Sequence, residues 1–488
     1  MTDSPSPAPP AARWGLSIAV ALLGSWILWN AELGINWPLW LATASIALIV
    51  VAHRRYGGAG TPAVVSAAWA VILASGTAIT TAGGWHALLL AGSVLFFSIA
   101  LAAAGERSLD ALRPRLAVAA PFGAIAAVFG GVIGELSDRA GAQRLAARSS
   151  VTRSVLITAP VIIVLVLLLA NADPFFAALR SALENLVPID DPARIFFFFF
   201  LLALSIGVLG TVARGASQAP VLPEFGGLAI GRLESRVLAS SMAVVMWLFV
   251  ASATISFFRN PAARTGSGVT YADYAHRGFA ELNVAAALVI GAILTTRRTW
   301  ERDDRLVWRA AVAALAGVGG MLVIAFLRLV RYEQAYGFTY QRLQAQGFML
   351  LLACAIAFLA AEVVRRAPSL RFAYRTMTAA LVIGMASVYF NTDAWIVRRN
   401  VDLYQKTGVL DVSYLTRNLS GDAIPAIAAS VPRLHEPERT AIDTVLRGRA
   451  FSGASHHARW FAWNLRARQR AKALDAYVSA PTPPPAAP

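Results

Sequence analysis

The chain alternates between long apolar stretches and short polar connections. Twelve stretches are nearly free of charged residues, and each approaches the roughly 20 apolar residues that a helix needs to cross a bilayer. The apolar residues run continuously instead of alternating with a period of two, which disfavours a transmembrane β-barrel. The pattern therefore predicts an all-α polytopic transmembrane helix bundle of about 11–12 membrane helices. The stretches cover approximately residues 14–30, 37–53, 62–81, 84–104, 115–134, 153–170, 194–212, 236–258, 281–297, 309–328, 342–364 and 374–391.

The two ends of the chain differ from this pattern. Residues 1–12 and 479–488 are rich in Pro and Ala, which predicts a disordered N-terminus and a disordered C-terminus around a bundle at 13–391. The first apolar stretch is expected to be a retained helix and not a cleaved signal peptide. Residues 392–478 are more polar and predict an extramembrane region of amphipathic helices, at about 393–406, 421–431, 437–449 and 456–478.

The last of these amphipathic stretches places aromatic residues ahead of a basic run. Trp460, Phe461 and Trp463 precede Arg466, Arg468 and Arg470. Aromatic residues followed by basic ones favour a helix that lies on the membrane surface. A small helical cap packed on the outer face of the bundle is an equal alternative.

Composition changes the expected partners more than the fold. The chain is 57% apolar and 14% charged, with a formal net charge of +16 that arginine largely supplies; soluble domains carry about 25% charged residues. Because the arginines flank apolar stretches, they indicate anchoring to anionic headgroups and not binding to nucleic acid. The single cysteine, Cys354, allows no disulfide and no thiolate metal site within one chain. We expect neither a cofactor nor a metal.

Arginines in the short connections predict the orientation of the bundle, because cytoplasmic loops are enriched in them. Arginine-rich connections follow the second, fourth, ninth and eleventh stretches, and all four should be cytoplasmic, as should the N-terminus. Yet an odd number of crossings separates the second stretch from the ninth, so one stretch is not a simple crossing. The arginines are Arg54 and Arg55; Arg107, Arg113 and Arg115; Arg297, Arg298, Arg302 and Arg305; and Arg365, Arg366 and Arg371.

The fifth stretch, 115–134, is the best candidate for an irregular element. It contains Pro121 and several glycines, and arginines lie on both of its flanks. A re-entrant or in-plane segment would satisfy both flanks, provided that protein or water covers its backbone. Eleven crossings then place the C-terminal tail outside the cytoplasm. The alternative is twelve plain crossings with both termini in the cytoplasm, which puts one arginine group on the wrong side.

Six blocks of sequence carry a family resemblance: Ala172–Phe175, Tyr271–Phe279, Arg328–Arg342, Asn391–Asn400, Asp411–Leu415 and Asp422–Pro425. They resemble a bacterial integral membrane family, the domain of unknown function 4173, which is close to 4153, and the resemblance covers about residues 150–470. Thr392 is a departure, since the family pattern has Pro there. The resemblance implies a multi-pass protein of the bacterial inner membrane without established activity, so no catalytic residue can be transferred.

The strongest candidate site lies between the tenth and eleventh stretches, where Arg328, Arg331, Glu333, Tyr336 and Arg342 fall close together. On the favoured topology this connection is extracytoplasmic, where arginine is unusual. Arginine holds phosphate groups through paired hydrogen bonds, so the cluster predicts an anion or lipid-headgroup site. The alternative is that Glu333 pairs with a neighbouring arginine while the others extend to headgroups.

A second candidate, a polar interface site, comprises Asp273, His276, Arg277 and Glu281. The first three share one helical face, and an acid beside a histidine could relay protons near neutral pH. The alternative is a short amphipathic helix along the membrane surface. One histidine with scattered carboxylates does not make a metal site.

Glu32, in the first external connection, is a weaker candidate. Membrane glycosyltransferases with lipid-linked donors often place an acid there. No phosphate-binding loop, Ser/His/Asp spacing or HExxH motif is present. The first hypothesis is a non-enzymatic membrane protein in transport, lipid handling or envelope regulation. The alternative is a membrane-embedded transferase acting on a lipid-linked substrate at the extracytoplasmic face. The expected partners are the bilayer and an anionic lipid or lipid-linked substrate.

Overall fold

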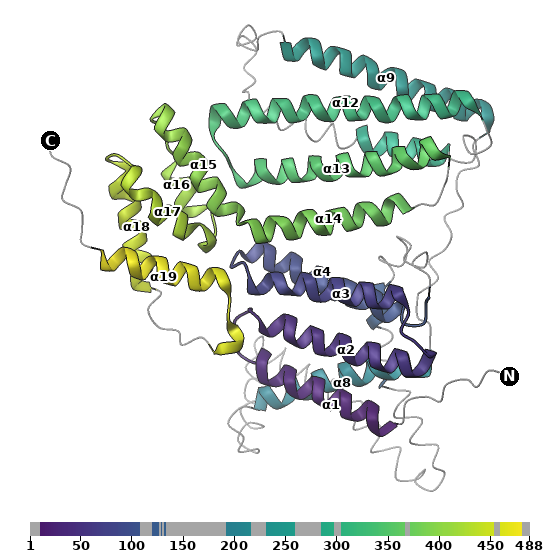
Figure 1. The fold of residues 1–488 in the computed structure, drawn as a ribbon, viewed down its shortest axis with the longest axis vertical. Coiled ribbons are helices and arrows are strands. Elements are labelled where there is room, and N and C mark those ends of the chain that lie inside the picture. Colours follow the sequence, from purple (N-terminus) through teal and green to yellow (C-terminus); the bar gives the residue numbers. More distant parts are fainter. Residues whose placement is uncertain are drawn as a thin grey trace, which may run out of the picture. The chain divides into compact units, whose positions relative to one another are not determined.

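The computed structural model describes residues 10–107, 120–125, 128, 131–132, 192–215, 231–258, 285–296, 304–366, 371–452 and 459–480 (Figure 1). Within these ranges every regular element is a helix, which confirms the predicted all-α fold. The chain divides into two compact units. Unit 1 comprises Met1–Leu222 and Ala454–Gln469, and unit 2 comprises Pro223–Gly453 and Arg470–Pro488. The predicted boundary between bundle and tail at residue 391 stays a prediction.

Unit 1 is a bundle of apolar helices. It contains α1 (Pro10–Leu28), α2 (Asn36–Tyr56), α3 (Thr61–Ser75) with the short η1 (Gly76–Ala78), α4 (Gly83–Ala102) and α8 (Pro192–Arg214). Helix α3 packs against α4 and α2, while α1 packs against α2 and α8. Many buried side chains here are alanine, among them Ala63, Ala67, Ala70 and Ala74 on α3. Small residues let helix backbones approach closely, which is the usual means of packing in a membrane.

Only parts of the predicted fifth stretch fall within the described residues. Ala120–Ile125 and Gly131–Val132 are helical there, and Gly131 lies against Gly207 of α8. A Cβ atom built on Gly131 would lie 2.0 Å from the carbonyl oxygen of Gly207, so the two backbones touch. Arg214 also donates a 2.8 Å hydrogen bond to the carbonyl of Gly131. Whether this stretch crosses the membrane stays a prediction, and 153–170 lies outside the described residues.

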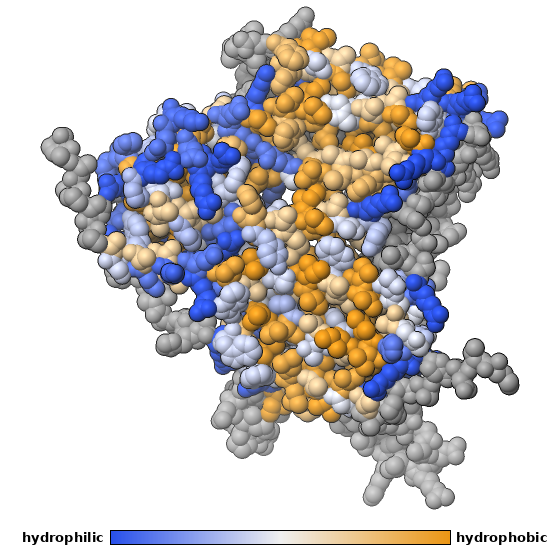
Figure 2. All heavy atoms as spheres, in the orientation of Figure 1, coloured by the Kyte–Doolittle hydropathy of each residue, from blue (hydrophilic) through white to orange (hydrophobic). Residues whose placement is uncertain are grey.

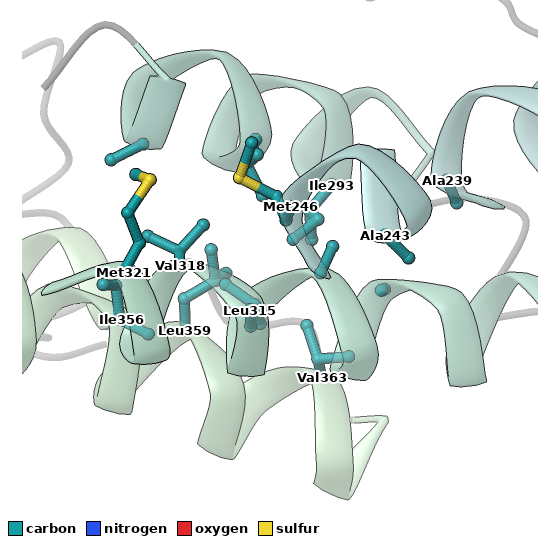
Figure 3. Close-up of a cluster of buried hydrophobic side chains, with 14 of the residues drawn as sticks. Ala239, Ala243, Met246, Ile293, Leu315, Val318, Met321, Ile356, Leu359 and Val363 are labelled. Atoms are coloured by element: carbon teal, nitrogen blue, oxygen red, sulfur yellow. The ribbon is translucent and has the colours of Figure 1, made fainter. Parts of the chain in front are cut away.

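The described part of unit 2 contains four long helices: α9 (Arg232–Phe258), α12 (Arg305–Tyr336), α13 (Tyr340–Arg365) and α14 (Arg371–Phe390). Helix α12 packs most extensively against α9 and also against α13, which in turn packs against α14. A shorter apolar helix, Ala285–Thr295, adds Ile293 to their common core. Figure 3 shows that core, where Met246 of α9 and Leu315 of α12 lie among buried aliphatic side chains.

A buried carboxylate fixes the start of α12. Oδ1 of Asp304 accepts hydrogen bonds from the backbone N–H groups of Leu306 and Val307, at 3.2 and 3.3 Å. Oδ2 accepts from Nε of Arg236 on α9 at 2.9 Å. Burial alone raises the pKa of Asp304, but these hydrogen bonds and the arginine charge outweigh it, so the pKa lies below its usual value. The side chain therefore caps one helix and holds another beside it.

The C-terminal helices of unit 2 have a core of their own. Helices α14 and α15 (Thr392–Thr407) meet at an angle of 62°, where Asn391 adopts the left-handed conformation with φ of 56°. Its side chain accepts from the N–H of Ala394 at 3.1 Å and so caps α15. Buried aliphatic residues such as Ile396, Ile427 and Leu446 join these helices. The others are α16 (Val412–Arg417), η4 (Gly421–Ala423), α17 (Ile424–Ser430), η5 (Val431–Arg433) and α18 (Glu438–Ser452).

The final segment holds η6 (Trp460–Ala462) and α19 (Leu465–Ser479), and the division between the units falls inside α19. Leu474 of α19 is buried in the C-terminal core of unit 2, so this part of the helix packs on protein. Helices lie over the predicted amphipathic stretches, whereas α16 was not predicted.

Seven helices in the described ranges are long and apolar enough to cross a membrane, or eight if the bent pair α14 and α15 forms one span. Figure 2 shows apolar side chains along the long helices and hydrophilic ones near their ends and over the C-terminal helices. Every predicted stretch that falls wholly within the described residues is helical over most of its length. The protein is therefore a polytopic helix bundle of the membrane type.

Candidate functional site

Two arginines of α12 bind the backbone of the last turns of α9. Arg328 donates to the carbonyl of Ala253 at 3.2 Å, and Arg331 to that of Phe257 at 3.2 Å. The Cζ atom of Arg331 also lies 3.7 Å from the centroid of the Phe257 ring. Both hydrogen bonds therefore join α12 to the last described turns of α9.

Arg331 also ends an exposed apolar strip on α12. Val323, Leu327 and Arg331 are spaced four residues apart, so they lie on one face of the helix. Val323 and Leu327 expose 58% and 43% of their surface, and Arg331 is exposed as well. We call this row the α12 strip. It presents aliphatic side chains over two turns and a cation on the third.

Glu333 faces inward and is only 2% exposed. Its Oε2 atom accepts a hydrogen bond of 2.6 Å from Nε2 of Gln346 on α13. Its Oε1 atom is buried and has no hydrogen-bond partner among the described residues. The expected alternative, in which Glu333 forms an ion pair with a neighbouring arginine, is not the arrangement found in this part of the structure. The guanidinium groups of Arg328 and Arg331 instead donate to backbone carbonyls of α9.

Arg342 closes the C-terminus of α12. It donates to the carbonyl of Tyr336 at 3.1 Å and to that of Gly337, and its Cζ lies 4.1 Å from the centroid of the Tyr332 ring. Gly337 has a φ of 78°, a conformation that side chains rarely adopt. A Cβ on Gly337 would also lie 2.6 Å from Oδ1 of Asn400. All five residues predicted for this site therefore lie on α12 and the start of α13, with Arg342 and Tyr336 in direct contact.

Two residues that were not predicted as site residues hold the connection between α12 and α13. Asn400 of α15 accepts from the N–H of Phe338 at 2.8 Å and donates to its carbonyl at 2.7 Å. The hydroxyl of Tyr414 on α16 accepts from the N–H of Tyr340 at 2.6 Å. Burial raises the pKa of Tyr414 above its usual value. The connection is consequently fixed by the C-terminal helices.

A second polar cluster joins blocks of the family resemblance. The buried carboxylate of Asp393 accepts from the backbone N–H of Ser420 at 3.0 Å and from its hydroxyl. The N–H of Asp422 is bound to the same hydroxyl at 3.2 Å, and Asn391 donates to the carbonyl of Asp422 at 3.1 Å. These bonds hold the bend between α14 and α15 against η4. Their partners are backbone groups and a hydroxyl, which indicates a structural role.

The remaining predicted site residues are placed as follows. Glu32 is exposed in the connection between α1 and α2, and its backbone carbonyl accepts from Nδ2 of Asn36 at 3.0 Å. Asp273, His276, Arg277 and Glu281 lie outside the described residues. Among the residues that the structure does describe, no group of three or more His, Cys, Asp or Glu side chains could hold a metal ion.

In unit 1, the C-terminal segment crosses two helix connections. The N–H of Ile35 donates to the carbonyl of Trp463 at 3.0 Å. Nδ2 of Asn464 donates to the carbonyls of Thr77 and Thr80, each at 2.8 Å. A Cβ on Gly34 would lie 2.5 Å from the Trp463 carbonyl oxygen, so only glycine allows this approach. We call residues 459–466 the clasp, because they bind the α1–α2 and α3–α4 connections together.

A family model described as "Domain of unknown function (DUF4153)" matches residues 17–430. Because this match covers most of the chain, the protein belongs to that family. The match is to the neighbour of family 4173, which the sequence blocks resemble. No curated protein and no solved structure matches the chain.

Proposed function

We propose that this member of the DUF4153 family is a non-enzymatic protein of the bacterial inner membrane that binds an anionic lipid at the α12 strip. The coarse part of this statement, a multi-pass membrane protein, rests on the helices described above. The observation that carries the rest is the exposed Arg331 at the end of an exposed apolar row. The geometry suits a lipid because apolar and cationic surfaces follow one another along one helix face.

The dimensions of the strip fit a lipid. Eight residues separate Val323 from Arg331, which is about 12 Å along a helix. Aliphatic side chains over that length would contact an acyl chain, and the guanidinium would meet the headgroup at the membrane surface.

The guanidinium of Arg331 is fixed and has bonding capacity left. The Phe257 ring and carbonyl hold it in place. Of the five N–H donors of arginine, one is used within the described residues. The others can bind two phosphate oxygens side by side. In the same part of the chain no carboxylate is paired with Arg331, so its charge is open to an anion.

We further propose that the N-terminus is cytoplasmic and the C-terminal tail is extracytoplasmic. The clasp binds the connections on either side of the α2–α3 pair, at Ile35 and at Thr77. Those two connections share one side of the membrane if α2 and α3 each cross it. The last turn of α2, just before the connection to α3, carries Arg54 and Arg55, which favour the cytoplasm. The clasp would then lie on the opposite side.

An orientation test uses a cysteine at the end of α19. In a Cys354→Ala background, Ser479→Cys is expected to react in intact cells with a maleimide that cannot cross the inner membrane. Arg54→Cys is the cytoplasmic control and should react only after the membrane is broken. Reaction of Ser479→Cys only after breakage would overturn the proposed orientation.

The lipid proposal is tested by native mass spectrometry of the full chain purified in mild detergent. We expect a retained anionic phospholipid, and Arg331→Gln should weaken its binding about fivefold, since a basic residue at an anionic surface contributes about 1 kcal/mol. Arg399→Gln is a matched control, because Arg399 is also exposed and lies 5.5 Å from the centroid of the Trp395 ring.

Equal lipid retention by wild type and Arg331→Gln would overturn the assignment of the site. Turnover of a lipid-linked donor that is lost in Glu32→Gln would overturn the non-enzymatic proposal in favour of a transferase.

A further inference from the structure

An exposed group of aromatic side chains lies in unit 1, where the end of α1 meets the clasp. The rings of Trp26 and Trp460 contact edge to face with centroids 6.1 Å apart, and the ring of Phe461 lies 6.0 Å from that of Trp26. Trp26 is 51% exposed and Trp460 is 62% exposed, although Phe461 is buried. Two large rings from distant parts of the sequence therefore present a joint surface.

This pair continues an exposed apolar row on α1. Ile18, Leu22 and Trp26 are spaced four residues apart and lie on one face of the helix. They expose 39%, 56% and 51% of their surface. On a membrane helix, an exposed aliphatic row faces acyl chains, and tryptophan at its end lies at the level of the headgroups. Trp460 extends that row from α1 onto the clasp.

A cation stands beside the two rings. Arg459 is exposed and donates a long hydrogen bond of 3.5 Å to the carbonyl of Trp29. Its Cζ lies 5.8 Å from the centroid of the Phe461 ring. Glu32, in the same connection, is exposed but forms no ion pair with Arg459. The charge beside the rings is that of Arg459, which complements an anionic headgroup.

Hydrogen bonds fix the clasp, which carries Trp460 and Arg459, to the two helix connections of unit 1. Asn464 binds two carbonyls of the α3–α4 connection, and the Trp463 carbonyl binds the N–H of Ile35. The N–H of Arg466 also donates to the carbonyl of Ile79 at 3.2 Å. A preorganised surface loses little entropy when a ligand binds.

We propose that Trp26, Trp460 and Arg459 form a binding site for an anionic phospholipid at the membrane interface. The acyl chain would lie along Ile18 and Leu22, the glycerol region would lie against the tryptophan rings, and Arg459 would bind the phosphate. Binding would hold the clasp, and with it the C-terminal segment, at the membrane surface. This site is in unit 1 and is independent of the α12 strip, which is in unit 2.

Depth is the first test. In the Cys354→Ala background, a nitroxide is placed at position 460 (Trp460→Cys) and, as a control, at 468 (Arg468→Cys), which is exposed on α19. The protein is reconstituted in nanodiscs of phosphatidylcholine with phosphatidylglycerol. We expect the label at 460 to be relaxed more by oxygen than by a water-soluble nickel chelate, and the label at 468 to show the reverse. A label at 460 that behaves like the one at 468 would overturn the proposal.

Affinity is the second test, measured by adding phosphatidylglycerol to delipidated full-length protein in native mass spectrometry. We expect Arg459→Gln to weaken one binding event about fivefold, while Arg459→Lys keeps most of it and Arg468→Gln is unchanged. Arg331→Gln should weaken a different event, so the double variant should lose both.

Unchanged binding in Arg459→Gln, or equal loss in Arg468→Gln, would overturn the proposal. So would a dimer whose formation protects the label at 460, since a second copy would then occupy this surface. Thermal unfolding of each variant is the folding control: an unfolding temperature equal to that of the wild type excludes misfolding as the cause of weaker lipid binding.

Discussion

The phenol of Tyr477 donates a hydrogen bond of 2.7 Å to Oδ1 of Asp443, which ties the end of α19 to α18. Nε of Arg447 binds the same carboxylate at 2.9 Å. Burial raises the pKa of Asp443, but the bonds from Arg447 and Tyr477 and the nearby positive charge outweigh it, so the pKa is lowered overall. Burial and the bond to Asp443 raise the pKa of Tyr477 to about 12. The docking of α19 is therefore expected to depend on pH at both extremes.

The loss of α19 docking at low pH, its acid limb, follows from Asp443. A carboxyl whose pKa is lower in the folded state stabilises that state above its unfolded pKa of about 3.9, and this stabilisation is lost as the pH falls through the folded pKa. The alkaline limb follows from Tyr477, whose contribution is complete below about pH 10 and is lost as the pH rises toward 12.

Tyr477→Phe should remove the alkaline limb and loosen α19 by about 1 kcal/mol at neutral pH. The measurement is amide hydrogen exchange of residues 470–479 as a function of pH. Tyr389→Phe is a control for the loss of an exposed phenol elsewhere. Identical exchange in wild type and Tyr477→Phe would show that this hydrogen bond does not hold the helix.

Replacement of Asn400 tests the fixed connection between α12 and α13. Asn400→Ala leaves the N–H and C=O of Phe338 without their partners, which typically costs about 1–3 kcal/mol. We expect a lower temperature of thermal unfolding in detergent. Asn418→Ala is the control, because Asn418 is exposed on the end of α16. Equal effects of the two substitutions would contradict the role assigned to Asn400.

The sequence predicted the helices well because membrane helices depend on local composition. A charge-free run of sufficient length identifies α2 or α4 without any knowledge of what packs beside it. The change to amphipathic sequence after Asn391 predicted a separate region there, but not the 62° bend between α14 and α15. Short elements such as α16 were missed, because six residues (Val412–Arg417) carry too little periodicity.

The site was predicted in part, for a physical reason. The cluster of arginines between α12 and α13 was visible, since the residues are adjacent in sequence. Their partners were not, because Arg328 and Arg331 bind carbonyls 75 and 74 residues away. Asn464 binds Thr77 across 387 residues. Nearness in sequence suggested that Glu333 pairs with an arginine, but the fold brings Gln346 to it instead.

The close approach of the clasp to unit 1 predicts a strong effect of Gly34→Ala. The added Cβ would lie 2.5 Å from the Trp463 carbonyl oxygen, and backbone atoms cannot rotate away as a side chain can. We expect a loss of about 1–3 kcal/mol and faster proteolysis between residues 453 and 465. Gly84→Ala is the control, since a Cβ there meets no atom within 4 Å. Equal proteolysis of the two variants would contradict the close approach.

The packing of α9 on α12 allows a matched comparison of two glycines on one helix. A Cβ on Gly317 would lie 2.8 Å from the Cβ of Met246, whereas a Cβ on Gly319 meets nothing within 4 Å. Alanine favours a helix over glycine by about 1 kcal/mol. Gly319→Ala should therefore leave stability unchanged or raise it.

In Gly317→Ala the same gain is opposed by contact with Met246, so α9 and α12 must move apart. The position of the Arg331 guanidinium in the α12 strip depends on that packing, because Arg331 reaches the Phe257 carbonyl only when α9 is close. We therefore expect Gly317→Ala to lower the unfolding temperature and to weaken lipid retention, and Gly319→Ala to do neither. Native mass spectrometry and thermal unfolding of the same preparations measure both. A Gly317→Ala protein that unfolds at a lower temperature but keeps its lipid would show that the Arg331–Phe257 contact does not position the headgroup.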